Sequence, residues 1–216
     1  GYKLMIIGHQ KGRDIESNIF RNFGMASPEG YRKALRLMRM AERFKLPILT
    51  FIDTSGAYPG IEAEEKGQSE AIAKNLAEMF GIKVPIVAVV IGEGGSGGAL
   101  GIGVADSILM LENSVYSVIS PEGCATILFN DSKKAPDAAR SLKIDSISLK
   151  SFGIIDGIVK EPLGGAHRDL KQASINLKTA VLKEFKKIDK FEIENLLEKR
   201  YNKYRKIGEF FEKEGE

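Results

Sequence analysis

The sequence is poor in the residues that most often carry catalysis and metal binding. Its 216 residues include one cysteine, Cys124, and two histidines, His9 and His167. A single cysteine excludes a disulfide framework and a cysteine-rich zinc site within the chain, and two histidines are too few for a metal centre built from histidine alone. No apolar run reaches the roughly 18 residues that a membrane-spanning helix needs. The function must therefore be sought among the plentiful residues, above all the 23 glycines.

Charge of neither sign dominates the chain. It has 32 Lys and Arg against 29 Asp and Glu, a formal net charge of +3, which gives no strong indication of nucleic-acid binding. Hydrophobic residues make up 43% and charged residues 28%, which is typical of a soluble globular protein with one large core. The strand-like run that follows Gly1 lacks an initiating methionine and a signal-peptide layout. We therefore expect an internal start and a cytoplasmic location.

Strand-like and helix-like segments alternate along most of the chain. Continuous apolar runs are typical of strands buried on both faces, and apolar residues at three- and four-residue spacing predict amphipathic helices. The predicted strands are residues 3–7, 47–53, 84–91, 107–111, 115–119 and 154–159, and the predicted helices are about 27–45, 67–80, 99–104, 136–142, 146–152, 169–185 and a segment from residue 120. This alternation predicts an α/β fold with a mostly parallel sheet flanked by helices.

One tetrapeptide and one change of composition mark further boundaries. Ser-Pro-Glu-Gly occurs at Ser27 and again at Ser120, where serine would cap a helix, proline would take its first position and glutamate its first turn. From Lys186 the charges alternate in sign while apolar residues keep helical spacing. We therefore divide the chain into a domain at residues 1–185 and a charged amphipathic helical tail at 186–216, packed on the domain or on a partner.

Glycine dominates one segment, where it occupies seven of the twelve residues from Gly92 to Gly103. Gly92, Gly94 and Gly97 have the spacing of the dinucleotide fingerprint, with Glu112 further along the chain. The segment follows the third predicted strand rather than the first, which weakens that interpretation. The phosphate-loop pattern fails because no Lys-Ser/Thr pair follows the last glycine.

The same segment also matches the nucleophile elbow of serine hydrolases. Gly94, Ser96 and Gly98 have its spacing, and Asp156 and His167 follow in the chain order of the catalytic triad. Nothing in the sequence places His167 near Ser96. Two unrelated motifs in one short segment show that neither is specific by itself.

All of these interpretations depend on the backbone of the glycine segment. Glycine lets the chain bend sharply and leaves N–H groups uncovered, and a helix N-terminus adds unpaired donors and a partial positive charge. Such a turn binds a phosphate, a carboxylate or a developing oxyanion. The alternative is close packing of a helix against a neighbour, which Ala99, Gly101 and Gly103 favour for the downstream part.

A second loop, residues 53–60, follows the preceding predicted strand. Ligands of open α/β sheets lie beyond the carboxyl ends of the strands, so this loop and the glycine turn should reach one edge of the sheet. Backbone N–H groups from both would then converge on a single oxygen. Asp53 is interpreted as a turn cap rather than as a base, and the acids at residues 62–65 as a solvated helix start rather than as a metal cluster.

Seven motifs in a fixed order are more specific than any single glycine pattern. They are GHQKGR at residues 8–13, NFGM at 22–25, PEGYRKA at 28–34, GAYPG at 56–60, GEGGSGGA at 92–99, YSVISPEGC at 116–124 and EPLGGAHR at 161–168. Together they resemble the alpha subunits of bacterial acetyl-CoA carboxylase carboxyltransferase from about Tyr2 to Tyr204. Two features depart from that family: it usually has a substantial segment before the first motif, and it commonly has proline at the position of Ser55.

The resemblance implies a crotonase-type fold, as in Clp protease and crotonase, with an oxyanion hole made of backbone N–H groups. It implies transfer of a carboxyl group from carboxybiotin, held on a separate biotin carrier protein, to acetyl-CoA, which gives malonyl-CoA for fatty acid biosynthesis. It also implies a beta subunit as partner, in an α2β2 assembly. The beta subunit would carry zinc on four cysteines, and this chain would hold no metal.

The resemblance further implies roles for named residues. We assign the ureido oxygen of biotin, where negative charge develops, to the N–H groups of Gly97 and Gly98, helped by Gly56 or Ala57. The remaining biotin contacts are expected from Gly94, Gly95, Ser96, Tyr58, Pro59 and Gly60. Because the biotin anion can itself remove the proton from the acetyl group, the chain needs no catalytic histidine.

Two alternatives stay open at this point: a serine hydrolase that uses Ser96, because Clp protease shares the fold, and a non-catalytic partner that orders a beta chain. Cys124 is interpreted as a small buried residue, and His9 and His167 as hydrogen-bonding loop residues. A further group of basic side chains is interpreted as solvated surface rather than as contacts to CoA or the carrier: Lys11, Arg13, Arg21, Arg32 and Lys33.

Overall fold

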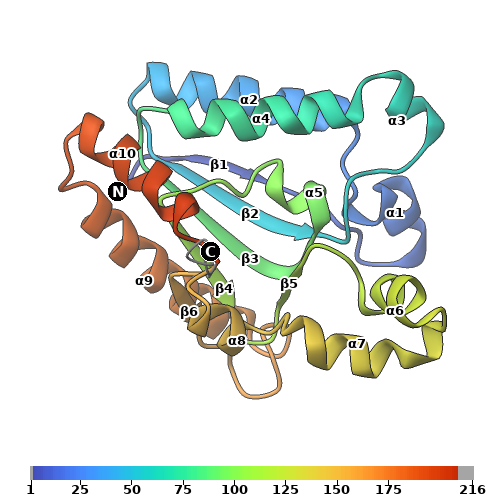
Figure 1. The fold of residues 1–216 in the computed structure, drawn as a ribbon. Helices are drawn as coiled ribbons and strands as arrows, with labels where there is room; N and C mark the ends of the chain where they lie inside the picture. The colour runs from blue at the N-terminus through green and yellow to red at the C-terminus, as the bar shows by residue number, and fades with distance from the viewer. Residues whose placement is uncertain (1, 209–216) are drawn as a thin grey trace, which may run out of the picture.

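A mostly parallel sheet forms the centre of the molecule in the computed structural model, which describes residues 2–208 (Figure 1). The strands lie in the order β1-β2-β3-β4-β6, with β5 beside β3, and every one of these pairs is parallel. Their bounds are β1 Met5–Gly8, β2 Ile48–Thr54, β3 Ile86–Gly95, β4 Ser107–Leu111, β5 Val115–Ser117 and β6 Gly157–Val159. Gly1 and residues 209–216, the end of the expected tail, lie outside the described residues.

Helices cover both faces of this sheet (Figure 1). The longer ones are α2 Pro28–Arg43, α4 Gln68–Gly81, α6 Pro121–Phe129, α7 Ala135–Leu142, α9 Leu170–Ile188 and α10 Ile193–Arg205. The short ones are α1 Ile15–Phe20, η1 Asn22–Gly24, α3 Ile61–Glu65, α5 Ser96–Leu100, η2 Ser132–Lys134 and α8 Ser146–Ser151. None of the described helices is both long and apolar enough to cross a membrane.

The central strands are apolar throughout because each of their faces enters a different core. Ile48 and Ile52 of β2 belong to the cluster that contains Met38 of α2 and Met79 of α4. Leu49, which directly follows Ile48, belongs to the core cluster on the opposite face, together with residues of α9. The alternation of side chains along a strand thus feeds both cores. The prediction of an α/β fold with a helix-covered, mostly parallel sheet is confirmed.

The two Ser-Pro-Glu-Gly segments do begin helices, but only one serine caps its helix. Ser120 Oγ accepts the N–H of Gly123 at 3.1 Å at the start of α6. Ser27 precedes α2 without a side-chain capping bond, so the cap predicted there is wrong. Proline at the first helical position is the feature that both starts share, because its missing N–H is one that a helix start leaves unpaired anyway.

Helix α10 is fastened to the sheet by a buried arginine. Arg200 is 1% exposed. Its guanidinium binds both carboxylate oxygens of Asp106 at 2.8 Å and donates to the carbonyls of Met79, Ile82 and Val84. It therefore gives a charged donor to carbonyls at and just beyond the end of α4, where the helix runs out of backbone donors of its own. The described part of α10 packs on the sheet domain, while a domain boundary at residue 185 stays a prediction.

Candidate active site

The loops after β1, β2 and β3 meet at one edge of the sheet, as expected for neighbouring parallel strands. The pairing of β2 with β3 is regular up to Ile52 and Val90, and then shifts so that Thr54 lies opposite Gly94. The extra residues on β3 form a bulge, which bends the strand where the glycine turn begins. This shift brings the second loop and the glycine turn side by side.

A carboxylate fills the space at the bulge. Asp53 Oδ1 accepts the N–H of Glu93 at 3.0 Å and lies 2.9 Å from Lys11 Nζ, which also pairs with the Glu93 carboxylate. A side chain at Gly92 would overlap the Asp53 carboxylate. Asp53 therefore acts as a turn cap, and a side chain at Gly92 would have to displace its carboxylate.

The second loop is anchored away from the sheet as well. Gln68 donates to the carbonyls of Ala26 and Tyr58, each at 2.9 Å, and the Tyr58 N–H donates to Ala26 at 3.1 Å. Within the loop, the Thr54 hydroxyl donates to the carbonyl of Gly56 at 2.7 Å and accepts its N–H at 3.2 Å. The backbone of this loop is therefore fixed by its own contacts.

Two glycines allow the loops to touch. A Cβ at Gly95 would overlap the carbonyl of Ser55, and one at Gly98 would overlap the backbone of Gly56 and Ala57. A Cβ at Gly97 would meet only Ile72, at 3.9 Å, which is an ordinary contact. Close packing thus explains Gly95 and Gly98, whereas Gly97 is not required by packing.

Three of the four proposed backbone donors have no acceptor among the described residues. The N–H groups of Gly97, Gly98 and Ala57 form no hydrogen bond there, whereas the N–H of Gly56 is bound to Thr54. Of the two N–H groups proposed in the second loop, that of Ala57 is therefore the one without a hydrogen-bond partner among the described residues. Ser96, just before Gly97, has a φ of +52°, a strained conformation that is often found at functional sites.

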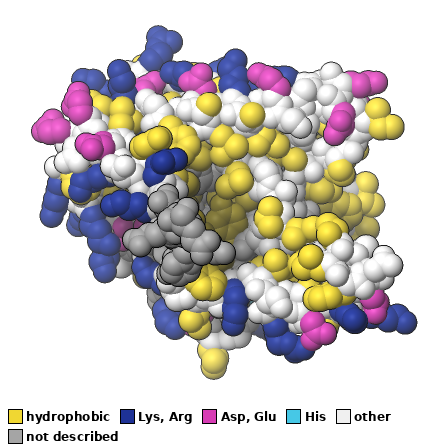
Figure 2. Space-filling model, viewed as in Figure 1, with side chains coloured by type: hydrophobic (Ala, Val, Ile, Leu, Met, Phe, Trp, Pro, Cys, Tyr) yellow, Lys and Arg dark blue, Asp and Glu magenta, His cyan; other side chains and the backbone are white. Residues whose placement is uncertain are grey.

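An apolar cavity of about 350 Å³ begins beside this turn. Ser96 and Leu100 of α5 line one part of it, Tyr116 of β5 another, and Tyr204 of α10 a third. Figure 2 shows hydrophobic side chains around a hollow in this face, in the region that Figure 1 places between α5 and α10. Burial raises the pKa of Tyr116 to about 12, so the cavity is lined by a neutral phenol at physiological pH.

The downstream glycines serve close packing, as the alternative interpretation predicted. A Cβ at Gly101 would overlap the ring of Tyr31, and one at Gly103 would lie 2.8 Å from the carbonyl of Ala99. The predicted helix at residues 99–104 is shifted, because α5 covers only Ser96–Leu100. A helix this short with bulged β3 before it does not match a dinucleotide-binding turn.

The triad required by the hydrolase interpretation does not assemble. Asp156 accepts the N–H of Ile108 at 2.6 Å and pairs with Lys203. His167 is exposed and lines a separate cavity with Glu161 and Glu112. Neither residue is hydrogen-bonded to Ser96 in the part of the chain that the structure describes.

The other sequence candidates fall into structural roles. Glu62 and Glu64 occupy the first turn of α3, and Tyr58 donates to Glu62 Oε1 at 3.4 Å. A Cβ at Gly60 would overlap the Tyr58 ring, and one at Gly94 would press on Tyr116. Cys124 is buried, as expected. A role of residues 58–60 and 94–96 in binding biotin stays a prediction.

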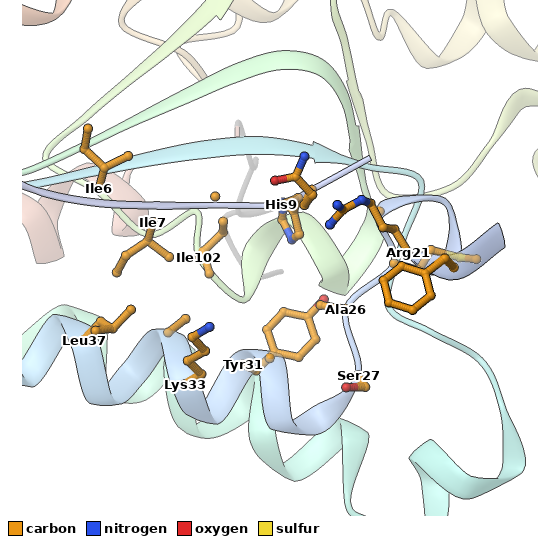
Figure 3. Close-up of a pocket in the computed structure, with 17 residues that line it drawn as sticks. Ile6, Ile7, His9, Arg21, Ala26, Ser27, Tyr31, Lys33, Leu37 and Ile102 are labelled. Carbon is orange, nitrogen blue, oxygen red and sulfur yellow. The ribbon is translucent and has the colours of Figure 1, made fainter. Parts of the chain in front are cut away.

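His9, interpreted from the sequence as a hydrogen-bonding loop residue, accepts the N–H of Asp53 on its Nδ1 at 3.4 Å. His9 lies after β1 and lines a cavity of about 520 Å³ together with Tyr31 and Ile102 (Figure 3). Burial lowers the pKa of His9 to about 4, although the nearby Asp53 and the backbone of Gly98 oppose that shift. The imidazole is therefore neutral at physiological pH.

Solved structures show which fold surrounds this turn. A chain of a Pseudomonas malonate decarboxylase hetero-tetramer, crystallised with coenzyme A, aligns with a TM-score of 0.72 and 18% identity over 95% of this chain and 83% of that chain. The transcarboxylase 12S, crystallised with methylmalonyl-coenzyme A and methylmalonic acid, aligns with a TM-score of 0.59 and 21% identity over 72% of this chain and 31% of that chain. The fold is thus the crotonase type, which confirms the predicted fold class.

Comparison of the sequence assigns the chain to a family within this fold. It belongs to the acetyl co-enzyme A carboxylase carboxyltransferase-like family, whose model matches residues 1–208. It is 64% identical over 210 residues to the acetyl-coenzyme A carboxylase carboxyl transferase subunit alpha of Fusobacterium nucleatum, covering 97% of this chain and 67% of that protein. The subunit alpha of Vibrio cholerae is 60% identical over 208 residues, covering 96% and 65%.

The family assignment made from the seven motifs is therefore confirmed. The chain spans about two thirds of the length of these relatives. Family membership favours a carboxyltransferase over the serine hydrolase, in agreement with the separation of Ser96 from Asp156 and His167.

Proposed function

We propose that this chain forms the biotin-binding half of an acetyl-CoA carboxylase carboxyltransferase. It would act with a beta subunit to transfer a carboxyl group from carboxybiotin on a carrier protein to acetyl-CoA, giving malonyl-CoA for fatty acid biosynthesis. The observation that carries this proposal is the group of unpaired N–H donors at Gly97, Gly98 and Ala57, set beside an apolar cavity. Family membership supports it independently.

The residues present fit biotin in chemical terms. A ureido carbonyl accepts hydrogen bonds, and the three unpaired N–H groups offer donors from two loops that are fixed against each other. The hydrocarbon parts of biotin suit the cavity lined by Leu100, Tyr116 and other apolar side chains. When bound, carboxybiotin supplies the carboxyl group, and its ureido oxygen gains negative charge as that group leaves.

This chain's own contribution is then electrostatic and positional. Fixed N–H donors stabilise charge where it develops, because they need no reorganisation at the moment of reaction. Gly95 and Gly98 hold the two loops in contact, and Asp53 with Lys11 holds the bulge that aims them. Removing one such donor costs on the order of 100- to 1000-fold in rate. No histidine or metal from this chain takes part in this account.

A partner subunit completes the proposed site. Apolar side chains on both sides of the loop edge are exposed in the single chain, including Phe20 of α1 at 82% and Leu128 of α6 at 67%. Exposed apolar patches of this kind mark interaction surfaces. We assign this edge to the beta subunit, which would bind acetyl-CoA in an α2β2 assembly in the cytoplasm.

A reconstitution assay tests the proposed function. Malonyl-CoA formation is measured with the chain, a beta subunit and carboxylated biotin carrier, and again with each component left out. The proposal expects product only from the complete mixture. A complete mixture that assembles but forms no malonyl-CoA would contradict it. Labelling of Ser96 by a fluorophosphonate probe, lost in Ser96→Ala, would instead support a serine hydrolase.

A further inference from the structure

The second loop leaves the sheet through Thr54, the last residue of β2. Thr54 is 0% exposed, and it lies opposite Gly94 in the register of β2 with β3. Because threonine is branched at Cβ, few side-chain rotamers are open to it. The Thr54 hydroxyl is therefore held in one place where the loop begins.

That hydroxyl makes two hydrogen bonds, and both are to Gly56. It donates to the Gly56 carbonyl at 2.7 Å and accepts the Gly56 N–H at 3.2 Å. A hydroxyl can do both at once, because it carries one donor and two acceptor lone pairs. The two bonds together fix both peptide planes that flank the Cα atom of Gly56.

Gly56 has little else to hold it in this conformation. A Cβ built on Gly56 would have no atom within 4 Å, and glycine has the widest choice of backbone conformations of any residue. Among the described residues, no group other than the Thr54 hydroxyl is hydrogen-bonded to the backbone of Gly56. The orientation of the peptide between Gly56 and Ala57 therefore depends on this hydroxyl.

The N–H of Ala57 belongs to the same peptide as the Gly56 carbonyl. In a trans peptide, the carbonyl and the N–H are directed to opposite sides. The bond from Thr54 to the carbonyl thus turns the Ala57 N–H away from Thr54. This N–H is one of the three proposed donors that have no acceptor among the described residues.

The peptide between Gly56 and Ala57 also lies against the glycine turn, where α5 begins beside the end of β2 (Figure 1). A Cβ at Gly98 would lie 2.3 Å from the carbonyl carbon of Gly56 and 2.5 Å from the nitrogen of Ala57. The Ala57 nitrogen is therefore next to Gly98, whose own N–H is unpaired among the described residues. Rotation of this single peptide would remove one donor from the group.

We propose that Thr54 is a positioning residue, whose hydroxyl holds the peptide between Gly56 and Ala57 in the orientation that offers the Ala57 N–H to the ureido oxygen. The inference rests on the proposed function of that group of donors. Thr54 acts only through the backbone, because its side chain is fully buried. A displacement of about 1 Å at a reacting group can cost on the order of 100-fold in rate.

Two substitutions at Thr54 separate its hydroxyl from its shape. Thr54→Val keeps the shape and removes both hydrogen bonds, whereas Thr54→Ser keeps the hydroxyl. In the complete complex we expect Thr54→Val to lower kcat by about 10- to 100-fold, with the KM for acetyl-CoA unchanged. Thr54→Ser should keep most of the activity. The proposal is overturned if the two variants have equal kcat values.

Thr179→Val is the matched control. The Thr179 hydroxyl also donates to a backbone carbonyl, that of Ile175 at 2.8 Å, but it lies at an exposed position of α9. Its loss should leave kcat unchanged. A fall in kcat in Thr179→Val as large as that in Thr54→Val would show a general effect of losing a threonine hydroxyl, and would overturn the proposal.

A double substitution tests whether Thr54 acts through the Ala57 N–H. Replacing Ala57 with lactate keeps the methyl group and exchanges the N–H for an ester oxygen. In that ester protein, Thr54→Val should lower kcat much less than it does in the unaltered protein, because residues that act through one group are not independent. The same fold-loss in both proteins would mean that Thr54 has a structural role only.

Deuterium exchange separates this inference from the proposed function. Exchange of the peptide that spans residues 53–60 should be faster in Thr54→Val than in Thr54→Ser, whatever the activity. Equal exchange in the two variants would contradict the role of Thr54 alone. An unaltered complete complex that forms no malonyl-CoA would contradict the proposed function alone.

Discussion

The glycines of the central turn differ in how closely the neighbouring atoms approach them. Gly92 makes room for the Asp53 carboxylate, and Gly98 lets the second loop approach to backbone contact. Gly97 has space for a side chain. The density of glycine in the segment therefore comes mostly from packing between loops, which leaves the N–H groups of Gly97 and Gly98 without acceptors among the described residues.

Burial of the neutral His9 predicts a pH dependence of stability. Its pKa falls from 6.5 in the unfolded chain to about 4 in the fold, so the unfolded chain binds the proton first as the pH falls. Stability is full above about pH 6.5 and is lost as the pH falls toward 4. Between pH 7 and pH 5 we expect a loss of about 2 kcal/mol in the free energy of unfolding from this residue.

Denaturant unfolding at the two pH values measures this effect. The difference in the free energy of unfolding between pH 7 and pH 5 should be smaller by that amount in His9→Gln, which has no ionisable group at residue 9. The same difference should be unchanged in His167→Gln. An equal pH dependence in His9→Gln and the unaltered chain would show that His9 is not held neutral by the fold.

At the scale of the elements, α10 is the clearest case of a segment fixed by one residue. The Arg200 side chain is fully buried and Asp106 is nearly so, and their pair also orders the end of α4. Asp106 further accepts the N–H of Ile86 at 2.7 Å, at the first residue of β3. The contact thus joins α10, α4 and the central strand at the edge opposite the glycine turn.

Arg200→Met should destabilise the protein by about 3–5 kcal/mol, because it leaves a buried carboxylate and several carbonyls without their donor. Arg205→Met, on the same helix at an exposed position, should change stability by no more than about 0.5 kcal/mol. Chemical denaturation of both variants measures the difference. Similar stabilities would mean that the buried pair does not hold α10 in place.

Much of the element order could be predicted from the sequence, because strands buried on both faces leave long apolar runs. Ser107–Leu111 is an example whose bounds match the prediction. The helix start expected at the acids of residues 62–65 is confirmed by α3, whereas α1 was not predicted, because six residues are too few to show a helical period. Arg200 stands in an alternating-charge segment where nothing distinguishes it from its exposed neighbours.

The candidate site was predictable only in outline. The two loops were expected to meet because parallel strands share one edge. Which N–H groups stay unpaired depends on contacts that no local pattern records, such as the Thr54 hydroxyl that binds the N–H of Gly56.

At the scale of the whole molecule, the loop edge is flanked by exposed apolar side chains that a single chain leaves in water. They occur on α1, which has no buried residue, and at the end of α6. Their position beside the candidate site agrees with a catalytic site that is completed by a second subunit. The acetyl-CoA side of the reaction is assigned to that partner.

Leu128→Asp should weaken assembly with the beta subunit, because a charge would be buried against an apolar surface. We expect at least a 10-fold rise in the Kd of the complex, measured by sedimentation or titration calorimetry. Leu170→Asp, at an exposed leucine of α9, is the control and should leave the Kd unchanged. An unchanged Kd in Leu128→Asp would remove α6 from the proposed interface.

The backbone donor at residue 97 is the most direct test of the account. Gly97→Ala keeps the N–H and fits the space beside Ile72, so its kcat in the complete complex should stay close to that of the unaltered enzyme. Replacing the same residue with lactate keeps the methyl group but exchanges the N–H for an ester oxygen. We expect the ester to lower kcat by about 100- to 1000-fold relative to Gly97→Ala. Equal kcat values for the two proteins would contradict the claim that this N–H stabilises the reaction.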